Sequence, residues 1–362
     1  MKKTISMILL LCMVLALAAC GGSSAPAATE APAEAPAATE APAAEEAPAE
    51  APAAGGEFKL GMGIVTSFDS CDTNKAQLDS TAATVVLDAE GKIVLCRIDC
   101  AQNAMDVTDG FLTLGGDYRT KMEKGADYGM AGVSPIGAEW DAQAKAFEEY
   151  VVGLTGEEVA NMETQLVNDH NISTDEALLA GCTMDITDMK EAVAKACADE
   201  WAVAFSAESA DFTLGLACIT DDSGSTEATE DEPAVVKMHT EFGAAVVSAE
   251  GKILAALNDA IQPNIEVAED GTVTPAEYNG SKRELGDDYG MVAFGAAIAE
   301  WDAQSDAFSK AVVGMTADEV AGMETKEHNG HQVTVDETLF ASCTMDITGM
   351  RAVIAQAAST AR

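Results

Sequence analysis

Basic residues are scarce in this chain. It has 20 lysines and arginines against 61 aspartates and glutamates, which gives a formal net charge of −41 at pH 7. A surface this acidic repels nucleic acids and anionic lipid headgroups, so both are poor partners. Cationic small molecules, metal ions or basic proteins would be attracted, although solubility of an exposed surface protein explains the charge more simply.

Signatures of common enzymes and metal sites are also absent. The sequence has no Walker-type phosphate loop, no His-Glu-x-x-His helix and no Gly-x-Ser-x-Gly elbow. Glu139 and Glu300 could act as general bases, but each precedes a tryptophan and has no partner acid in view. Residues 221–224 lack EF-hand spacing, and His170 and His331 lie in polar turns typical of solvated loops. The sequence therefore predicts no catalytic residue and no metal ligand, and leaves open whether the protein is an enzyme.

Long hydrophobic runs are missing after the N-terminus. Lys2 and Lys3 precede an apolar run at 5–17, which is too short to span a bilayer and suits a signal peptide. The run ends in Leu-Ala-Ala-Cys at 17–20, which resembles a bacterial lipobox. This resemblance implies a signal peptide over residues 1–20 and a lipid on Cys20 that anchors the mature protein outside the cytoplasm on the bacterial cell membrane. The alternative is an ordinary secretory signal with an incidental cysteine.

Residues 21–57 contain almost nothing that a protein core could bury. The segment consists entirely of Ala, Pro, Glu, Thr, Gly and Ser, and it contains no Lys or Arg. Such a composition predicts a disordered linker that prolines and like charges keep extended. At about 3.1 Å per residue its upper reach is on the order of 100 Å. The linker would hold the remaining chain clear of the membrane.

The rest of the chain carries one pattern twice. Three motifs recur 161 residues later: DYGM at 127–130 and 288–291, EWDAQ at 139–143 and 300–304, and CTMDIT at 182–187 and 343–348. A period this long indicates a whole domain duplicated in tandem. We therefore predict a first repeat over 58–207 and a second repeat over 210–362, joined near residues 206–211.

Each repeat places strand-like sequence before helix-like sequence. Apolar β-formers flank a glycine-containing turn at 88–91 in the first repeat and at 249–251 in the second, which predicts a hairpin in each. Helical spacing of apolar residues then predicts a helix over 137–151, with its tryptophan, Trp140, packed in the core. This order favours the α+β class, with an antiparallel sheet and helices packed on one face.

The sequence also predicts where four further helices begin. Thr155 and Thr316 begin capping boxes and should open short helices. The closing helices should start near Thr187 and Thr348, and the first should continue to Ala204.

The cysteines do not indicate a set of disulfides shared by the two repeats. The chain has nine cysteines, and the seven left after Cys12 and Cys20 are an odd number, so at least one thiol is free or pairs between molecules. Only Cys182 and Cys343 correspond between the repeats. Packing as a small apolar group explains this pair, and a reactive thiol at a helix N-terminus is the alternative.

A tight stretch of small residues lies before each closing helix, at 179–185 and 340–346. A turn of this kind leaves backbone N–H groups free for an anion such as phosphate. Thr183 and Thr344 would place a hydroxyl beside that phosphate, or they could serve as plain turn or cap residues.

At these residues the chain resembles the FMN-binding domain family, whose motif reads S-G-A-T before an alanine- and valine-rich helix. Residues 181–183 lie on G-A-T, Ala180 replaces the serine, and residues 189–196 resemble the helix. In many members the threonine is esterified by the FMN phosphate. The resemblance implies FMN as cofactor, held at these positions: Gly181, Cys182 and Thr183 in the first repeat, and Ser342, Cys343 and Thr344 in the second.

Two functions remain open at this point. The first is an anchored extracellular flavoprotein that carries FMN for electron transfer, with a redox partner and a flavin transferase as its partners. The second is a non-catalytic surface lipoprotein that binds a small ligand or another protein.

The lipobox gives a direct test. Cys20→Ala should leave unprocessed precursor or release the protein into the medium, because the lipid attachment point is lost. Membrane fractionation and intact mass of the two proteins, made in a bacterial host, measure this. Unchanged size and unchanged membrane association of the variant would rule out the anchor.

Overall fold

The computed structural model describes residues 54–295 and 297–362. The predicted signal peptide, Cys20 and the linker up to residue 53 lie outside these residues. Strand β1 begins at Ala54, so residues 54–57, assigned above to the linker, belong to a strand. Among the described residues no helix is both long and apolar enough to cross a membrane.

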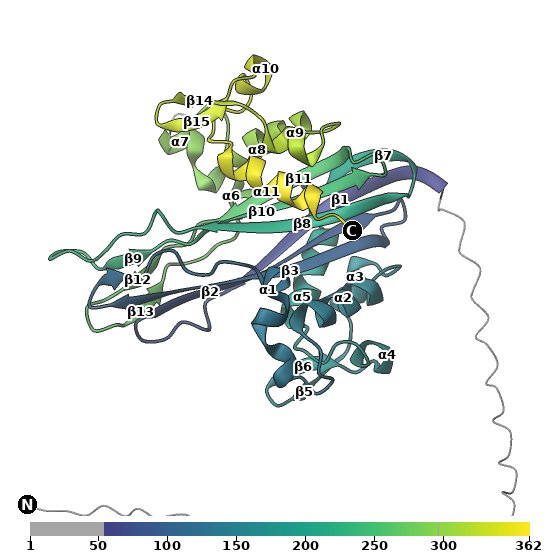
Figure 1. Ribbon diagram of the computed structural model, residues 1–362, viewed down its shortest axis with the longest axis horizontal. Helices are drawn as coiled ribbons and strands as arrows, with labels where there is room; N and C mark the ends of the chain where they lie inside the picture. Colours follow the sequence, from purple (N-terminus) through teal and green to yellow (C-terminus); the bar gives the residue numbers. More distant parts are fainter. Residues whose placement is uncertain (1–53, 296) are drawn as a thin grey trace, which may run out of the picture. The chain divides into compact units, whose positions relative to one another are not determined.

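The α+β class is confirmed, with antiparallel sheets and helices packed against them (Figure 1). The sheet of the first repeat has the order β4-β3-β2-β1-β7. Its strands are β1 Ala54–Ser67, β2 Lys75–Leu87, β3 Ile93–Thr108, β4 Phe111–Leu112 and β7 Val203–Ser209. Strands β2 and β3 form the predicted hairpin.

The main sheet of the second repeat has the order β11-β10-β8 and is also antiparallel. Its strands are β8 Phe212–Asp221, β10 His239–Ser248 and β11 Ile253–Ile261. A small sheet of order β13-β12-β9 comprises β9 Ala234–Val236, β12 Ile265–Val267 and β13 Val273–Pro275. The predicted hairpin of this repeat is the pair β10 and β11.

After the hairpin strands, short helices and two-stranded hairpins follow in the same order in both repeats. In the first they are α1 Lys121–Lys124, η1 Gly125–Tyr128, η2 Met130–Gly132, α2 Trp140–Tyr150, α3 Gly156–Ala160, β5 Thr164–Val167, β6 His170–Ser173, α4 Glu176–Leu179 and α5 Thr187–Cys197. In the second they are α6 Lys282–Leu285, η3 Gly286–Tyr289, α7 Met291–Gly295, α8 Trp301–Ala311, α9 Ala317–Ala321, β14 Thr325–His328, β15 His331–Thr334, α10 Glu337–Phe340 and α11 Thr348–Ser359. The predicted capping boxes at Thr155 and Thr316 are both formed.

One predicted boundary is wrong. Helix α5 ends at Cys197 and does not continue to Ala204, because residues 203–209 form strand β7 instead. This strand pairs with β1 and places Phe205 against Phe58 and Phe212, with ring centroids 5.6 Å apart in both contacts. Pairing of the backbone and burial of the ring outweigh the helical continuation.

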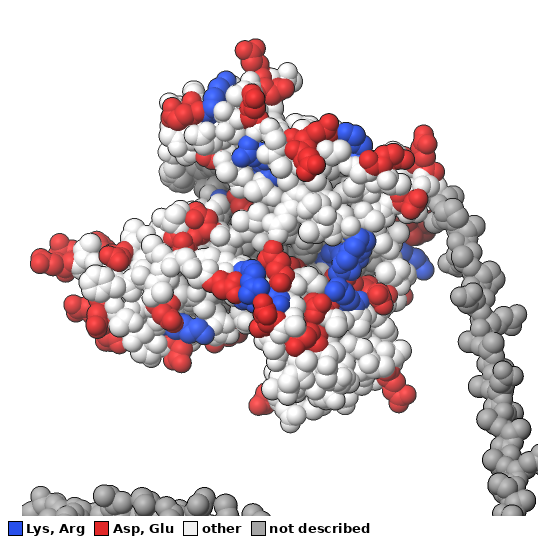
Figure 2. Space-filling view, in the orientation of Figure 1, with Lys and Arg blue, Asp and Glu red and all other residues white. Residues whose placement is uncertain are grey.

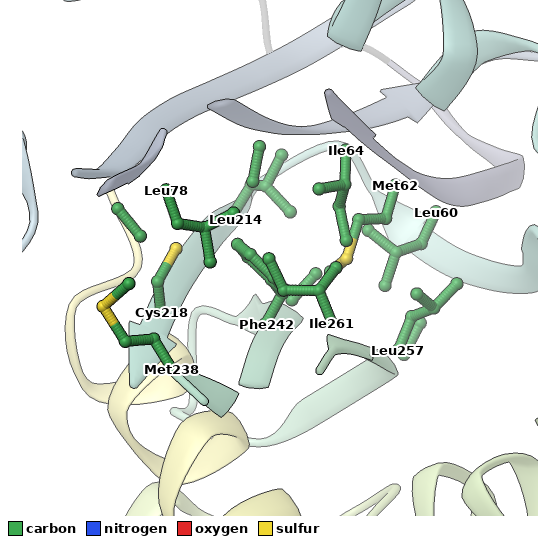
Figure 3. Packing of buried hydrophobic residues seen from close by; sticks show 14 of the residues in the cluster. Leu60, Met62, Ile64, Leu78, Leu214, Cys218, Met238, Phe242, Leu257 and Ile261 are labelled. Carbon is green, nitrogen blue, oxygen red and sulfur yellow. The ribbon is translucent and has the colours of Figure 1, made fainter. Parts of the chain in front are cut away.

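Three hydrophobic cores hold the described residues together. One lies between the helices and the sheet of the first repeat, and a second lies in the same place in the second repeat. The third lies between the two sheets and contains residues of both repeats, including Leu60, Leu78, Leu214, Phe242 and Leu257 (Figure 3). The main sheet of each repeat is therefore covered on both faces, by the helices of its own repeat on one face and by the main sheet of the other repeat on the other face. The boundaries of the two repeats as domains stay a prediction.

Polar contacts join the two repeats around this third core. The Nδ2 of Asn103 donates to the hydroxyls of Thr220 and Thr240 at 2.9 and 3.2 Å. The guanidinium of Arg362 donates to both carboxylate oxygens of the buried Glu148, at 3.0 and 2.7 Å. Most of the face shown in Figure 2 is uncharged, and its charged side chains are more often acidic than basic.

Each closing helix lies directly on a strand at a glycine. A Cβ atom added to Gly61 would lie 2.1 Å from the carbonyl oxygen of Ala196 in α5, and one added to Gly215 would lie 1.8 Å from that of Ala357 in α11. Only glycine permits this approach of backbone to backbone.

This packing predicts a stability effect. Gly61→Ala and Gly215→Ala should each lower the free energy of unfolding by about 1–3 kcal/mol, because the closing helix must shift. Gly56→Ala is the matched control, since a Cβ there meets nothing within 4 Å, and it should change stability by less than about 0.5 kcal/mol. Urea unfolding measures all three, and equal stability of Gly61→Ala and Gly56→Ala would contradict the packing argument.

Candidate functional site

The two threonines singled out from the sequence lie in turns between α4 and α5 and between α10 and α11. A glutamine of the preceding long helix holds each of them. The Oε1 of Gln143 accepts hydrogen bonds from the backbone N–H and the hydroxyl of Thr183, at 2.8 and 3.2 Å. The Oε1 of Gln304 does the same for Thr344, at 2.9 and 3.4 Å. Both glutamines are buried, so the position of each threonine is fixed by the core.

The start of each closing helix is occupied by the protein's own carboxylate. Asp185 accepts from the backbone N–H groups of Thr187 and Asn171, at 2.9 and 2.6 Å. Burial acts to raise the pKa of Asp185, but a hydrogen bond with the Thr187 side chain, together with those from the two backbone N–H groups, outweighs burial and lowers the pKa below its ordinary value. Asp346 is placed in the same way in the second repeat. The backbone donors that the sequence offered to a phosphate are therefore partly satisfied already.

The paired cysteines are buried beneath these turns. Cys182 and Cys343 have no exposed surface. Burial raises the pKa of Cys182 to about 11 and raises that of Cys343 as well, so neither thiol forms a thiolate readily. This favours the packing role over the reactive one. All seven cysteines of the described residues are free thiols.

A cavity of about 580 Å³ lies beside Thr183 in the first repeat. Strand β2, the segment around η2, helix α2 and the start of α5 form its walls. The apolar part of the lining consists of Met130, Val133, Pro135, Trp140, Met184 and Met189. The polar part includes Thr81, Ser134, Gln143, Thr183 and Thr187, and the ionisable part consists of Lys121, His170, Asp185 and Asp188.

The predicted site residues divide between two places. Thr183 lines this cavity, whereas Gly181 and Cys182 do not. Ser342 lines a separate cavity of about 730 Å³ near Ala311 and Asp336 in the second repeat. Cys343 is buried and Thr344 faces Gln304, so the structure does not bring the second set together around one cavity. His170 lines the first cavity, and no cluster of His, Cys, Asp and Glu among the described residues is arranged to hold a metal ion.

Lys121 is the basic group of the first cavity. Its ammonium lies over the rings of Tyr128 and Trp140, 5.3 and 5.7 Å from their centroids. In the part of the chain that the structure describes, Lys121 forms no ion pair within 4.0 Å. Trp140 and Trp301 are each 5 % exposed, so Trp140 packs in the core as predicted and Trp301 does the same in the second repeat.

The second repeat has the same lysine but a different neighbour on the strand. Lys282 lies over Tyr289 and Trp301 at 5.3 and 5.5 Å. Pairing of the hairpins sets Thr81 opposite Cys100 in the first repeat and Glu241 opposite Ala260 in the second, so Glu241 stands where the first repeat has Thr81.

Two largely buried titratable groups, His239 and Glu241, lie near Lys282. Its ammonium contacts the Nε2 of His239 at 3.1 Å, and burial and Lys282 together lower the pKa of His239 to about 4. One carboxylate oxygen of Glu241 lies 3.5 Å from the same Nε2, and the other is buried without a hydrogen-bond partner. Burial raises the pKa of Glu241 to about 7, although Lys282 opposes the change.

The sequence analysis missed Lys121, Gln143 and Thr81. Lys121 and Lys282 are 161 residues apart, as are Gln143 and Gln304, so the repeat carried a signal for two of the three. Thr81 is recognised only when the strand register is known. Comparisons with known protein families, with curated proteins and with solved structures find no match to this chain.

The shifted pKa of Glu241 predicts a pH dependence of stability. The carboxyl is protonated in both states below its ordinary pKa of 4.5, and the unfolded state ionises first as the pH rises. Stability should therefore fall between about pH 4.5 and 7, with Glu241 accounting for up to about 3 kcal/mol. Burial also raises the pKa of Asp99 and of Asp259 to about 6, and both add to the loss in the same direction.

Glu241→Gln isolates this contribution. The variant should lose less stability than the wild type when urea unfolding is compared at pH 4.5 and 7.5. Glu266→Gln, an exposed position on β12, is the control and should keep the wild-type pH dependence. Parallel pH profiles for Glu241→Gln and wild type would show that Glu241 does not carry the shift.

Proposed function

We propose that this protein is a lipid-anchored, extracytoplasmic binding protein that takes a small molecule in the cavity beside Thr183. The cavity itself is the observation that carries the proposal. Its volume of about 580 Å³ falls in the range of about 300–1,000 Å³ common for ligand sites. Apolar walls with a few polar groups at fixed positions are also typical of such sites.

The fixed groups come from the rigid parts of the repeat. Gln143 and Trp140 belong to α2, Thr81 belongs to a central strand, and the cation of Lys121 is held on two aromatic rings. A site built on such elements is preorganised, so a ligand loses little affinity to ordering of the protein. The predicted linker and anchor would present this cavity outside the cell.

Covalent FMN at Thr183 is the second candidate. The hydroxyl of Thr183 is half-buried at the cavity wall, and the cavity is large enough for a small ring system. The residues suit the phosphate less well, because Asp185 and Asp188 line the same wall and Lys121 is the one Lys or Arg of the lining. When bound, FMN would supply one- and two-electron redox chemistry, with a flavin transferase and a redox partner as the implied partners.

One experiment separates these functions. The protein should be made in its own host, or beside an active flavin transferase, and weighed in both native and denatured form. A small ligand should add mass to the native protein in a ratio of one to one. FMN esterified to Thr183 would also add mass after denaturation and give a visible flavin spectrum, and Thr183→Ala would abolish both.

Matched tryptophan variants locate the ligand. Thr187→Trp places a bulky ring at an exposed position of the cavity wall and should remove the added mass. Thr348→Trp makes the same change at the start of α11 and should retain it. A native mass equal to that of the bare chain, with no stabilisation by any compound of a metabolite library, would refute ligand binding. A colourless sample beside an active transferase would refute the flavin alone.

A further inference from the structure

The charges in the cavity wall indicate the chemical class of its ligand, if the proposed function holds. Lys121 brings one positive charge to the cavity, and it has no ion-pair partner within 4.0 Å among the described residues. Since its ammonium lies over the rings of Tyr128 and Trp140, it cannot turn away to solvent without losing both contacts. The cavity therefore offers a fixed cation to a ligand group of negative charge.

Carboxylates oppose a ligand that is only an anion. Asp185 and Asp188 line the same cavity, and the charge of Asp79 acts on both Lys121 and Asp188. The wall as a whole therefore has more negative than positive charge. A phosphate or a simple carboxylate would be repelled by these groups, whereas a simple amine would be repelled by Lys121.

The second repeat shows where a carboxylate fits beside this lysine. There Glu241 extends from the strand to within 3.5 Å of the Nε2 of His239, and the charge of Lys282 acts on it. In the first repeat the shorter Thr81 leaves that place open to the cavity.

The closing helix, which faces this strand position, also differs between the repeats. Asp188 is replaced in the second repeat by Gly349, where a Cβ would lie 3.1 Å from Glu241. Carboxylates of the chain therefore lie near both lysines. In the first repeat these are Asp79 of the strand and Asp188 of the helix, and in the second repeat it is Glu241 of the strand. Neither Asp79 nor Asp188 forms an ion pair with Lys121 within 4.0 Å, and Thr81 lines the cavity where the second repeat has Glu241, which leaves room beside Lys121 for a carboxylate of the ligand.

We propose that the cavity binds a zwitterion of the amino-acid class, with its carboxylate beside Lys121 and Thr81 and its ammonium toward Asp188. Three methionines in the lining, Met130, Met184 and Met189, adapt to an apolar side chain of variable shape. The ligand then satisfies both signs of charge in the wall and buries its apolar part.

Three probes of one carbon skeleton test the class by calorimetry on the wild-type protein. Leucine carries both charges, isopentylamine carries the ammonium alone, and isocaproate carries the carboxylate alone. Leucine should bind, and each analogue should bind at least about tenfold more weakly, a difference of about 1.4 kcal/mol. Equal binding of all three would mean that only the apolar wall is recognised, and would overturn the proposal.

Two variants locate the carboxylate of the ligand. Thr81→Glu installs the strand carboxylate of the second repeat and should abolish leucine binding. Glu241→Gln, which alters only the second repeat, should leave it unchanged. If Thr81→Glu does not fold, Lys121→Met serves instead and should weaken leucine at least about tenfold while leaving isopentylamine no weaker. Unaltered leucine binding by the folded variant used would overturn the proposal.

The experiments distinguish a wrong ligand class from a wrong proposed function. If leucine and other apolar amino acids do not bind, but host-made protein still carries a small molecule that Thr187→Trp removes, the ligand class is wrong and the cavity remains a binding site. If no small molecule is carried either, both are wrong.

Discussion

The fold depends on the burial that the two sheets give each other. Neither sheet is covered by helices on more than one face, and the remaining faces meet in a core that contains Leu60, Leu78, Leu214 and Phe242. Separation of the repeats would expose both faces to water, at a cost of about 25 cal/mol for each Å² of apolar surface. We therefore expect the first repeat, and with it the cavity, to depend on the second repeat for its stability. The two repeats are therefore expected to unfold in one transition.

Elements whose signal lies within a few neighbouring residues could be predicted from the sequence. The hairpins, the helix that contains Trp140 and the capping boxes at Thr155 and Thr316 follow from spacing within a few residues. The helix predicted to continue to Ala204 overlaps the start of strand β7, because the partner strand β1 is about 150 residues away and tertiary pairing overrides local propensity. The core between the sheets was missed for the same reason.

The site was predicted only in part. Thr183 was recognised from its turn and does line the cavity, but the acidic groups that fill the helix start were not given weight. Thr81 and Lys121 become neighbours through the register of β2 with β3 and the position of α1, neither of which a sequence pattern states. The repeat could have shown the lysine and the glutamine, because both recur at the same interval.

The burial of the thiols has a consequence for how this protein meets an oxidising environment. Cys96, Cys100, Cys182 and Cys218 are buried in the native state, and burial raises the pKa of each. Since the thiolate is the form that reacts, alkylating agents and oxidants can reach these positions only when the cores open. The rate of their modification therefore measures how often the native structure opens.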